Sequence, residues 1–476
     1  MPPVLALALT LVFILALFKW DSKIESYTPS SSLWIPSIWL LLLGSRPVSL
    51  WFTSGEYVQA GEAADALMEG SPLDRQLLGF IIFAGVVVLF KRRVSLVQVC
   101  RDNPWLMAYY VYCAVSILWS DFPYISFKRW IKGLGDPIMA LIVATETQPS
   151  KAFEALIKRC GFILLPFSIL LIKYYPHLGR AFEYYSGAMS YTGVTTDKNM
   201  LGFQCLVAGL VAVYKVFVWR TKAVDSRKIS ELVVPFALLW MSQWLLWTAN
   251  SKTPTVSLIF GVCLIALLGY TWVRQNLSIM LLSLATVYGI LELTVGITRL
   301  IIESAGRDPT LTGRTDLWAV VLAMDDQVLF GYGFESFWLG DRLLKLWDLY
   351  FFKPIQAHNG YIEIYLNLGV MGLVLVVGLF ISCYKRIQKM LSIPLSPETS
   401  EQLVFDRFRL AFLLGFLIYN VTEAGIKSLH FMFVILLMVI VHYRRQASSR
   451  LPHASFAQVG RPDASFGRVV RGGRSW

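Results

Sequence analysis

Arg314 and His358 are the residues of this chain whose types and positions best suit chemistry on a phosphorylated substrate. Arg314 precedes a segment, 315–324, whose apolar residues fall on one helical face. A guanidinium at the N-terminus of such a helix adds to the positive end of the helix dipole and favours phosphate binding. The imidazole of His358 is the most available general base near neutral pH, and it suits removal of a proton from a hydroxyl group.

The neighbours of His358 bear on its role. His358 begins an apolar segment at the expected water boundary, where a lone histidine is as readily a capping or hydrogen-bonded residue as a functional one. Asn359 and Glu363 are also polar at the start of this segment, which favours a functional site. Glu363 lies five residues further along, close to the helical face of His358 but not on it.

Two more polar segments contain candidate binding residues. Lys252, in the break 249–254, could place an ammonium group and a helix N-terminus against a lipid phosphate, or it is a turn lysine that extends to water. The stretch 173–199 is rich in Tyr, Gly and Thr, which suits carbohydrate contact and equally suits an ordinary loop. Within it, Lys198 either binds substrate or pairs with Asp197.

The remaining cations near these segments have two interpretations each. Arg307 is an auxiliary phosphate ligand or a solvated loop residue, and the basic, aromatic run 127–130 is most simply a membrane-interface anchor. The chain has no Walker loop, dinucleotide glycine fingerprint or His-Glu-x-x-His motif, and no aspartate pair of the kind that holds a metal on a nucleotide sugar. We therefore expect a reaction that uses no metal and no cofactor.

The composition identifies the elements that must position these residues. Of 476 residues, 56% are hydrophobic and only 16% are charged, against about 25% charged in a soluble domain, which excludes a soluble protein. Apolar helices cross a membrane with about 20 residues. The candidate spans are 2–18, 33–52, 77–90, 104–119, 131–145, 160–172, 200–219, 232–247, 254–272, 277–298, 360–383, 408–423 and 426–443. We predict an all-α polytopic membrane protein with about 12–13 transmembrane helices.

The distribution of Lys and Arg predicts the orientation. Basic connections alternate along the chain and therefore lie on one side, which the positive-inside rule makes cytoplasmic; they are 91–103, 146–159, 220–231 and 384–409. The net charge of +12 thus indicates topology and not a nucleic-acid partner. The opposite loops are extracytoplasmic, and they are 53–76, 120–130, 173–199, 248–253 and 299–359.

The domain organisation follows from these spans. Residues 1–443 form one polytopic membrane domain, and the basic, Gly/Ser-rich segment 444–476 is a disordered cytoplasmic tail. The extracytoplasmic loop 299–359 is long for a compact protein and is rich in Trp, Tyr and Phe, which predicts packed structure with short helices.

The order of these polar motifs resembles the O-antigen ligase and Wzy-type polysaccharide polymerase superfamily. The resemblance rests on Ser251–Lys252, on Gly313–Arg314 with Trp318, and on Ala357–His358–Asn359 followed by Gly369 and Gly372. By motif it covers a core of residues 195–385. Four other short segments are similar to bacterial exopolysaccharide polymerases of the succinoglycan type. They are Gly44–Pro47, Ser71–Arg75, Trp119–Asp121 and Asp197–Asn199.

This resemblance implies a GT-C-like, inverting, metal-independent glycosyltransferase in the bacterial inner membrane, with its active site on the periplasmic side. The donor would be a glycan on undecaprenyl pyrophosphate. Arg314 would hold the pyrophosphate, and His358 would activate or orient the acceptor hydroxyl. Lys252 stands where ligases commonly have Arg, which keeps the charge but loses the bidentate fork.

Three functions follow as alternatives. A polymerase would use another lipid-linked repeat unit as acceptor, whereas an O-antigen ligase would attach the polymer to lipid A-core or protein. A transporter or flippase of lipid-linked glycans should show two related halves with charges near the midplane, and the sequence shows no such repeat. Expected partners are the lipid-linked donor, a sugar or lipid-linked acceptor, the bilayer and other polysaccharide assembly proteins.

Overall fold

A computed structural model describes residues 1–52, 70–182, 187, 189–296, 314–392 and 400–444. The first helices are α1 (Pro3–Ile24), α2 (Trp34–Leu43), α3 (Ser49–Phe52), α5 (Pro72–Lys91), α6 (Leu96–Asp102), α7 (Pro104–Val115), α8 (Pro123–Gly133), α9 (Gly135–Ala144), α10 (Pro149–Tyr174) and α11 (Pro176–Gly179). The later helices are α12 (Lys198–Thr221), α13 (Val233–Ala249), α14 (Lys252–Leu267), α15 (Thr271–Val295), α17 (Arg314–Ala323), α18 (Gly340–Leu349), α19 (Gly360–Leu391), α20 (Ser400–Tyr419) and α21 (Phe431–Ile440). Strands β1 (Arg180–Phe182) and β2 (Met189–Tyr191) pair antiparallel.

The described helices confirm the predicted fold class, an all-α polytopic membrane protein. Seven are long and apolar enough to cross a membrane: α1, α5, α10, α12, the stretch Ile229–Ala249 that contains α13, α15 and α19. Shorter apolar helices cover Ser31–Leu43, Pro104–Trp119, Lys252–Leu267 and Phe431–Ile440. The total of 12–13 crossings stays a prediction. The predicted tail, 444–476, lies outside the described residues apart from Arg444.

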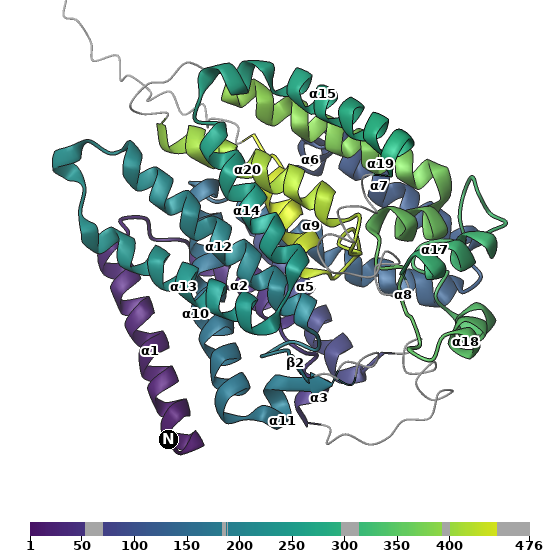
Figure 1. Ribbon diagram of the computed structural model, residues 1–476, viewed down its shortest axis with the longest axis horizontal. Helices are drawn as coiled ribbons and strands as arrows, with labels where there is room; N and C mark the ends of the chain where they lie inside the picture. Colours follow the sequence, from purple (N-terminus) through teal and green to yellow (C-terminus); the bar gives the residue numbers. More distant parts are fainter. Residues whose placement is uncertain (53–69, 183–186, 188, 297–313, 393–399, 445–476) are drawn as a thin grey trace, which may run out of the picture. The chain divides into compact units, whose positions relative to one another are not determined.

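Helix α12 lies at the centre of the packing, against α10, α13, α14 and α20 (Figure 1). The buried ring of Tyr214 lies 5.8 Å from that of Phe405 and 5.7 Å from that of Phe408, measured between ring centroids. Such aromatic packing holds α12 rigidly against α20. The N-terminal end of α12 can therefore act as a fixed support for polar groups.

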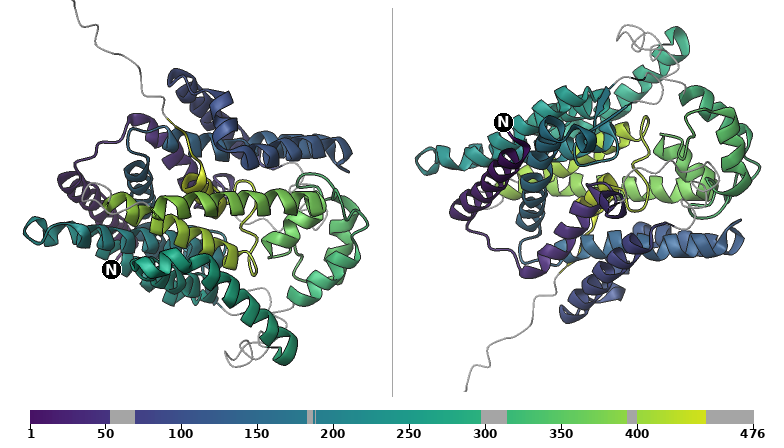
Figure 2. Two further views of the ribbon diagram at one scale, coloured as in Figure 1. Left: turned by 90° about the horizontal axis from the view of Figure 1, so that it is seen from above. Right: turned by 90° about the horizontal axis from the view of Figure 1, so that it is seen from below.

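The described part of the long loop, residues 314–359, is packed, as its aromatic content predicted. Helices α17 and α18 gather near the start of α19 (Figure 2), around a separate apolar core of Leu317, Val321, Tyr332, Phe337, Trp338, Leu343, Leu346, Trp347, Ala357 and Leu366. The loop also inserts into α19 at Gly369, whose φ of +64° interrupts the helix. There the amides of Val370 and Met371 donate to the carbonyls of Val328 and Leu329.

Several predicted spans have the wrong bounds. The span 160–172 begins too late, because α10 starts at Pro149, so most of the predicted connection 146–159 is helix. The span 33–52 is broken, because α2 ends at Leu43 and the guanidinium of Arg46 donates to backbone carbonyls of the segment 178–195. The span 408–423 begins and ends too late, because α20 covers Ser400–Tyr419. The residues after Tyr419 form a turn, in which the Asn420 side-chain oxygen satisfies two backbone amides.

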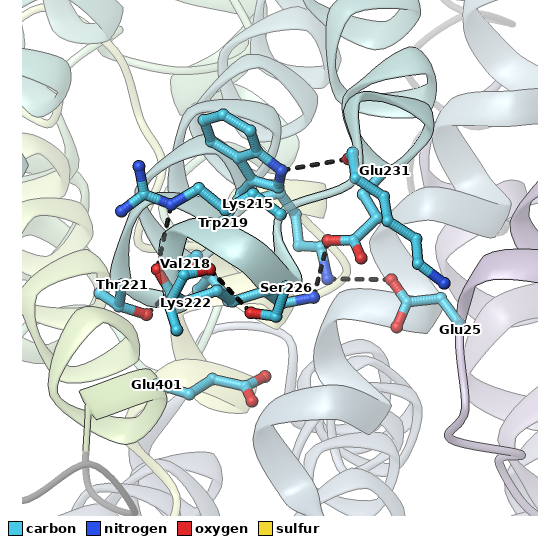
Figure 3. A network of polar contacts seen from close by, with 12 residues as sticks. Glu25, Lys215, Val218, Trp219, Thr221, Lys222, Ser226, Glu231 and Glu401 are labelled. Carbon is cyan, nitrogen blue, oxygen red and sulfur yellow. Dashed lines mark hydrogen bonds and ion pairs between the residues drawn. The ribbon is translucent and has the colours of Figure 1, made fainter.

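A cluster of buried charges joins α1, α10 and α12. The Lys158 ammonium lies 2.7 Å from the Asp21 carboxylate, 3.0 Å from that of Glu25 and 2.9 Å from that of Glu154. Lys215 contacts the last two at 2.9 and 2.8 Å, and Figure 3 shows its bond to Glu25. Because three carboxylates surround two ammonium groups, each cation is paired at least twice.

Candidate functional site

The first turn of α17 supplies two of the motif residues. Arg314 is its first residue, and its guanidinium donates to the carbonyl of Thr422 and to the carboxylate of Glu423. Trp318, four residues later and therefore on the same helical face, donates from Nε1 to the carbonyl of Ala357 at 2.7 Å. The Arg-x-x-x-Trp spacing thus lets one short helix hold two distant segments of the chain.

The turn after α20 lies directly against the N-terminus of α19. The Gly360 amide donates to the carbonyls of Asn420 and Glu423, at 2.9 and 3.1 Å. The side-chain oxygen of Asn420 accepts from the amides of Gly425 and Ile426, which closes the turn. A Cβ at position 360 would lie 2.1 Å from that oxygen, so this approach requires glycine.

His358 is held at the start of α19 in an unusual backbone conformation. Its φ is +51°, a region that non-glycine residues seldom occupy and that is often found at functional sites. Next to it, Asn359 caps α19 by accepting from the amides of Tyr361 and Ile362. The imidazole Nδ1 lies 3.6 Å from a carboxylate oxygen of Glu423 and 3.4 Å from the Gln356 side-chain nitrogen. The side chain stays 32% exposed.

Glu423 connects all these groups. Its Oε1 accepts from the Asn199 side-chain nitrogen at 2.9 Å and from Arg314 Nη2 at 3.2 Å, while its Oε2 faces His358. The carboxylate is almost completely buried. Burial alone would raise the pKa of Glu423, but the hydrogen bond with His358 and the charge of Arg314 outweigh it and hold the pKa below its usual range. Glu423 therefore remains ionised at neutral pH.

The N-terminus of α12 completes this side of the cluster. Asp197 caps the helix by accepting from the amides of Asn199 and Met200, each at 2.9 Å. The cap fixes the first turn, from which Asn199 reaches Glu423. Lys198 is the first residue of the helix and is partly exposed beside this contact.

Lys252 lies at the same end of the bundle but outside the cluster. It is the first residue of α14, and the adjacent Ser251 and Pro254 pack against Gly202, one turn into α12. Within the ranges that the structure describes, the exposed Lys252 ammonium has neither a hydrogen bond nor an ion pair. Arg307, the remaining predicted ligand, lies outside the described residues.

Glu363 faces away from His358. Its carboxylate accepts from Trp338 Nε1 at 2.9 Å and from the amide of Ala357, and it is buried. Through its bond with the Ala357 amide it fixes the loop backbone just before His358.

The main residue missed by sequence reasoning is Glu423. It was assigned to the end of a predicted span, although Asn420, Thr422 and Glu423 form a polar run directly after an apolar helix. Such a run was the available signal. Asn199 was noticed only as part of a motif. Across the described residues, no three His, Cys, Asp or Glu side chains gather into a metal-binding group.

Comparisons with known proteins identify similar sequences. Residues 236–377 match the family described as O-antigen ligase, a segment that contains Lys252, Arg314 and His358. The chain is 26% identical over 310 residues to an exopolysaccharide production protein, ExoQ, of Rhizobium meliloti (strain 1021). The match covers 62% of this chain and 68% of that relative.

Proposed function

Because the chain belongs to the O-antigen ligase and Wzy-type polysaccharide polymerase superfamily, we propose that it transfers a glycan from undecaprenyl pyrophosphate to a sugar hydroxyl. The product is a longer lipid-linked chain of exopolysaccharide or O-antigen repeat units. The reaction takes place at the periplasmic face of the bacterial inner membrane, inverts the anomeric centre and uses no metal.

One observation carries this proposal: a single buried carboxylate, Glu423, is shared by Arg314 and His358. The shared carboxylate holds a guanidinium for an anionic leaving group and an imidazole for a proton next to each other. Arg314 and His358 keep 21% and 32% of their side-chain surface exposed, so a substrate can reach both. The same carboxylate orients the imidazole and the guanidinium toward one place.

The chemistry follows from these groups. The acceptor hydroxyl oxygen attacks the anomeric carbon of the donor sugar, and the bond from that carbon to the pyrophosphate oxygen breaks. The bonding electron pair leaves with the pyrophosphate, whose charge Arg314 stabilises. The acceptor proton passes to His358 as general base. Glu423 stabilises the resulting imidazolium, so atoms and charges balance without a cofactor.

The other cations bind parts of the substrate away from the reacting atoms. Lys252, at the N-terminus of α14, supplies a second phosphate contact, since its ammonium and the helix dipole both attract an anion. Lys198 contributes at the start of α12. Arg307 serves as an auxiliary ligand from the long loop.

The acceptor decides between polymerase and ligase. The matched relative is described as an exopolysaccharide production protein, which fits polymerisation. The matched family is described as O-antigen ligase, which fits ligation. Deletion of the gene separates them. A polymerase mutant accumulates single lipid-linked repeats, and a ligase mutant accumulates full-length polymer that is not attached.

The catalytic assignment is tested by complementing such a deletion with Arg314→Ala or His358→Ala. We expect loss of long polymer at an unchanged level of the protein in membranes. His177→Ala, which removes an imidazole from an exposed position of another extracytoplasmic loop, is the matched control and should restore polymer. Normal polymer length and yield from His358→Ala would show that the assignment is wrong, and inhibition of the purified protein by EDTA would contradict metal independence.

A further inference from the structure

A second group of cations lines a cleft between α5 and α8. The cleft has a volume of about 230 Å³, and it is lined by Arg75, Gly79, Ile82, Ile125, Phe127, Lys128, Arg129, Ile131 and Lys132. Four of these residues are cationic and none is acidic. A cavity lined by one sign of charge attracts a ligand of the opposite sign, and low-dielectric walls strengthen that attraction.

Three cations of this cleft are available to an anionic ligand, because no carboxylate that the structure describes forms an ion pair with Arg75, Lys128 or Lys132. The Lys128 ammonium lies 4.5 Å above the ring of Tyr124. Arg129 donates to the backbone carbonyl of Glu335 at 2.6 Å, and Glu335 lines the adjoining cavity together with Arg129 and Lys132. Arg75 and Lys132 form no ion pair with any residue that the structure describes. The neighbouring Asp74 is engaged elsewhere, with the hydroxyl of Ser49.

The surroundings indicate a ligand with a lipid chain. Tyr124, Phe127 and Ile131 lie on one stripe of α8 and are 72%, 48% and 41% exposed. A helix with an apolar stripe and several Lys and Arg residues typically lies in the membrane interface. The basic cleft therefore opens where a lipid head group would be, next to the surface that the acyl or polyprenyl chain would contact.

A second cavity continues from this cleft toward the candidate site. It has a volume of about 270 Å³ and shares Arg129 and Lys132 with the cleft. Its other end is lined by Glu363 and Lys427. Lys427 belongs to the same turn as Glu423, and Glu363 fixes the backbone before His358. The linings of the two cavities therefore extend from the cleft to residues that adjoin the candidate site.

We propose that the α5–α8 cleft binds the pyrophosphate of the acceptor, a second polyprenyl-linked glycan, while Arg314 holds the pyrophosphate of the donor. This inference rests on the proposed function, because only polymerisation requires two lipid pyrophosphates at the same time. The acceptor glycan then runs through the shared cavity and presents its terminal hydroxyl to His358. Two separate cationic sites keep the two pyrophosphates apart and thereby limit their mutual repulsion.

The test measures binding of glycan-free undecaprenyl pyrophosphate to the full-length protein in phosphatidylcholine nanodiscs. We expect two molecules per wild-type protein. The double variant Arg75→Ala, Lys132→Ala should lose one of them, with at least tenfold weaker affinity at that site, and Arg314→Ala should lose the other. Arg75→Lys, Lys132→Arg keeps both charges and should restore binding.

The controls separate this inference from a general attraction and from the proposed function. Lys91→Ala, Arg101→Ala removes two exposed cations at the opposite end of α5 and in α6, and it should leave two sites. The cleft proposal is overturned if the Arg75→Ala, Lys132→Ala variant still binds two molecules of undecaprenyl pyrophosphate. It is also overturned if phosphatidylglycerol in the nanodisc competes for the cleft as effectively as undecaprenyl pyrophosphate does. If His358→Ala still polymerises but the cleft variant loses one site, the catalytic assignment fails and the cleft stands.

Discussion

The two ends of α12 contact two charged clusters of opposite design. Around Lys215, three carboxylates share two ammonium groups, and the side chains of Lys158 and Glu154 are only 4% and 3% exposed. Around Asn199, one carboxylate serves both Arg314 and His358, which are 21% and 32% exposed. Residues 198 and 215 are separated by roughly 25 Å of helix.

The two clusters differ in how completely their charged side chains are paired and buried. In the first cluster every cation has two or three carboxylate partners, so the charges serve only to join α1, α10 and α12. In the second, one carboxylate serves a guanidinium and an imidazole that are both partly exposed, so these groups can contact a substrate and change partners during a reaction. We call the cluster around Lys158 and Lys215 the saturated cluster, and the cluster around Glu423 the unsaturated cluster. Substitutions in the first should affect stability, and substitutions in the second should affect activity.

The largest expected effect is loss of activity without loss of stability at the unsaturated cluster. His358→Ala should reduce glycan transfer by about 10²–10⁴-fold, the usual contribution of a general base. The thermal unfolding midpoint in detergent should stay close to that of the wild type, because the side chain is partly exposed. If the activity of His358→Ala falls only in proportion to the amount of folded protein, the unsaturated cluster affects stability and not activity, and the distinction between the two clusters is wrong.

The reverse effect is expected at the saturated cluster. Lys158→Met leaves Asp21, Glu25 and Glu154 with one ammonium group, and breaking a buried pair in this way costs about 3–5 kcal/mol. The free energy of unfolding should fall accordingly, while transfer per folded molecule remains normal. Normal stability of Lys158→Met would show that the cluster is solvated and not structural.

A smaller, pH-dependent effect is expected for Glu423→Gln. Since the pKa of Glu423 lies below the ordinary 4.5, its carboxylate stabilises the fold above pH 4.5, and that contribution is lost as the pH falls through the folded-state pKa. The variant should be less stable by about 1–3 kcal/mol at neutral pH, and the difference should shrink in acid. Unfolding measured from pH 7 to pH 3 checks this. A difference that does not change with pH would contradict it.

The smallest effect is expected for an exposed ion pair that lies outside both clusters. Lys222 pairs with Glu231 at 2.6 Å, near the saturated cluster (Figure 3), but its side chain is 42% exposed. Because exposed pairs contribute about 0–1 kcal/mol, Lys222→Ala should change neither stability nor transfer by more than that. A loss comparable to that of Lys158→Met would mean that burial does not distinguish these pairs.

Much of the fold was predictable from local patterns. The apolar runs predicted most of the helices, and the periodicity of residues 315–324 predicted α17, whose Leu317 and Val321 are buried as expected. The spans 33–52 and 408–423 failed for one shared reason. Hydropathy does not register a polar side chain such as Arg46 or Asn420 that satisfies the backbone of a turn and so ends a helix within an apolar run.

The candidate site was predictable only in part. Arg314, His358 and Lys252 were recognised from residue type and position, whereas Glu423 was not. Glu363 was expected near the face of His358, but it turns to Trp338 and Ala357. Lys158 was counted among the cytoplasmic charges that set orientation, although it is buried among carboxylates.

The sequence by itself determined the class of protein, the helical segments and the residues able to bind phosphate or accept a proton. These properties depend on composition and on spacing within a few helical turns. Only the tertiary structure decided that Asn199, Arg314 and His358 share Glu423. These residues come from four segments that are far apart in the chain. Whether they meet depends on how α12, α17, α19 and α20 pack, and no local sequence pattern contains that information.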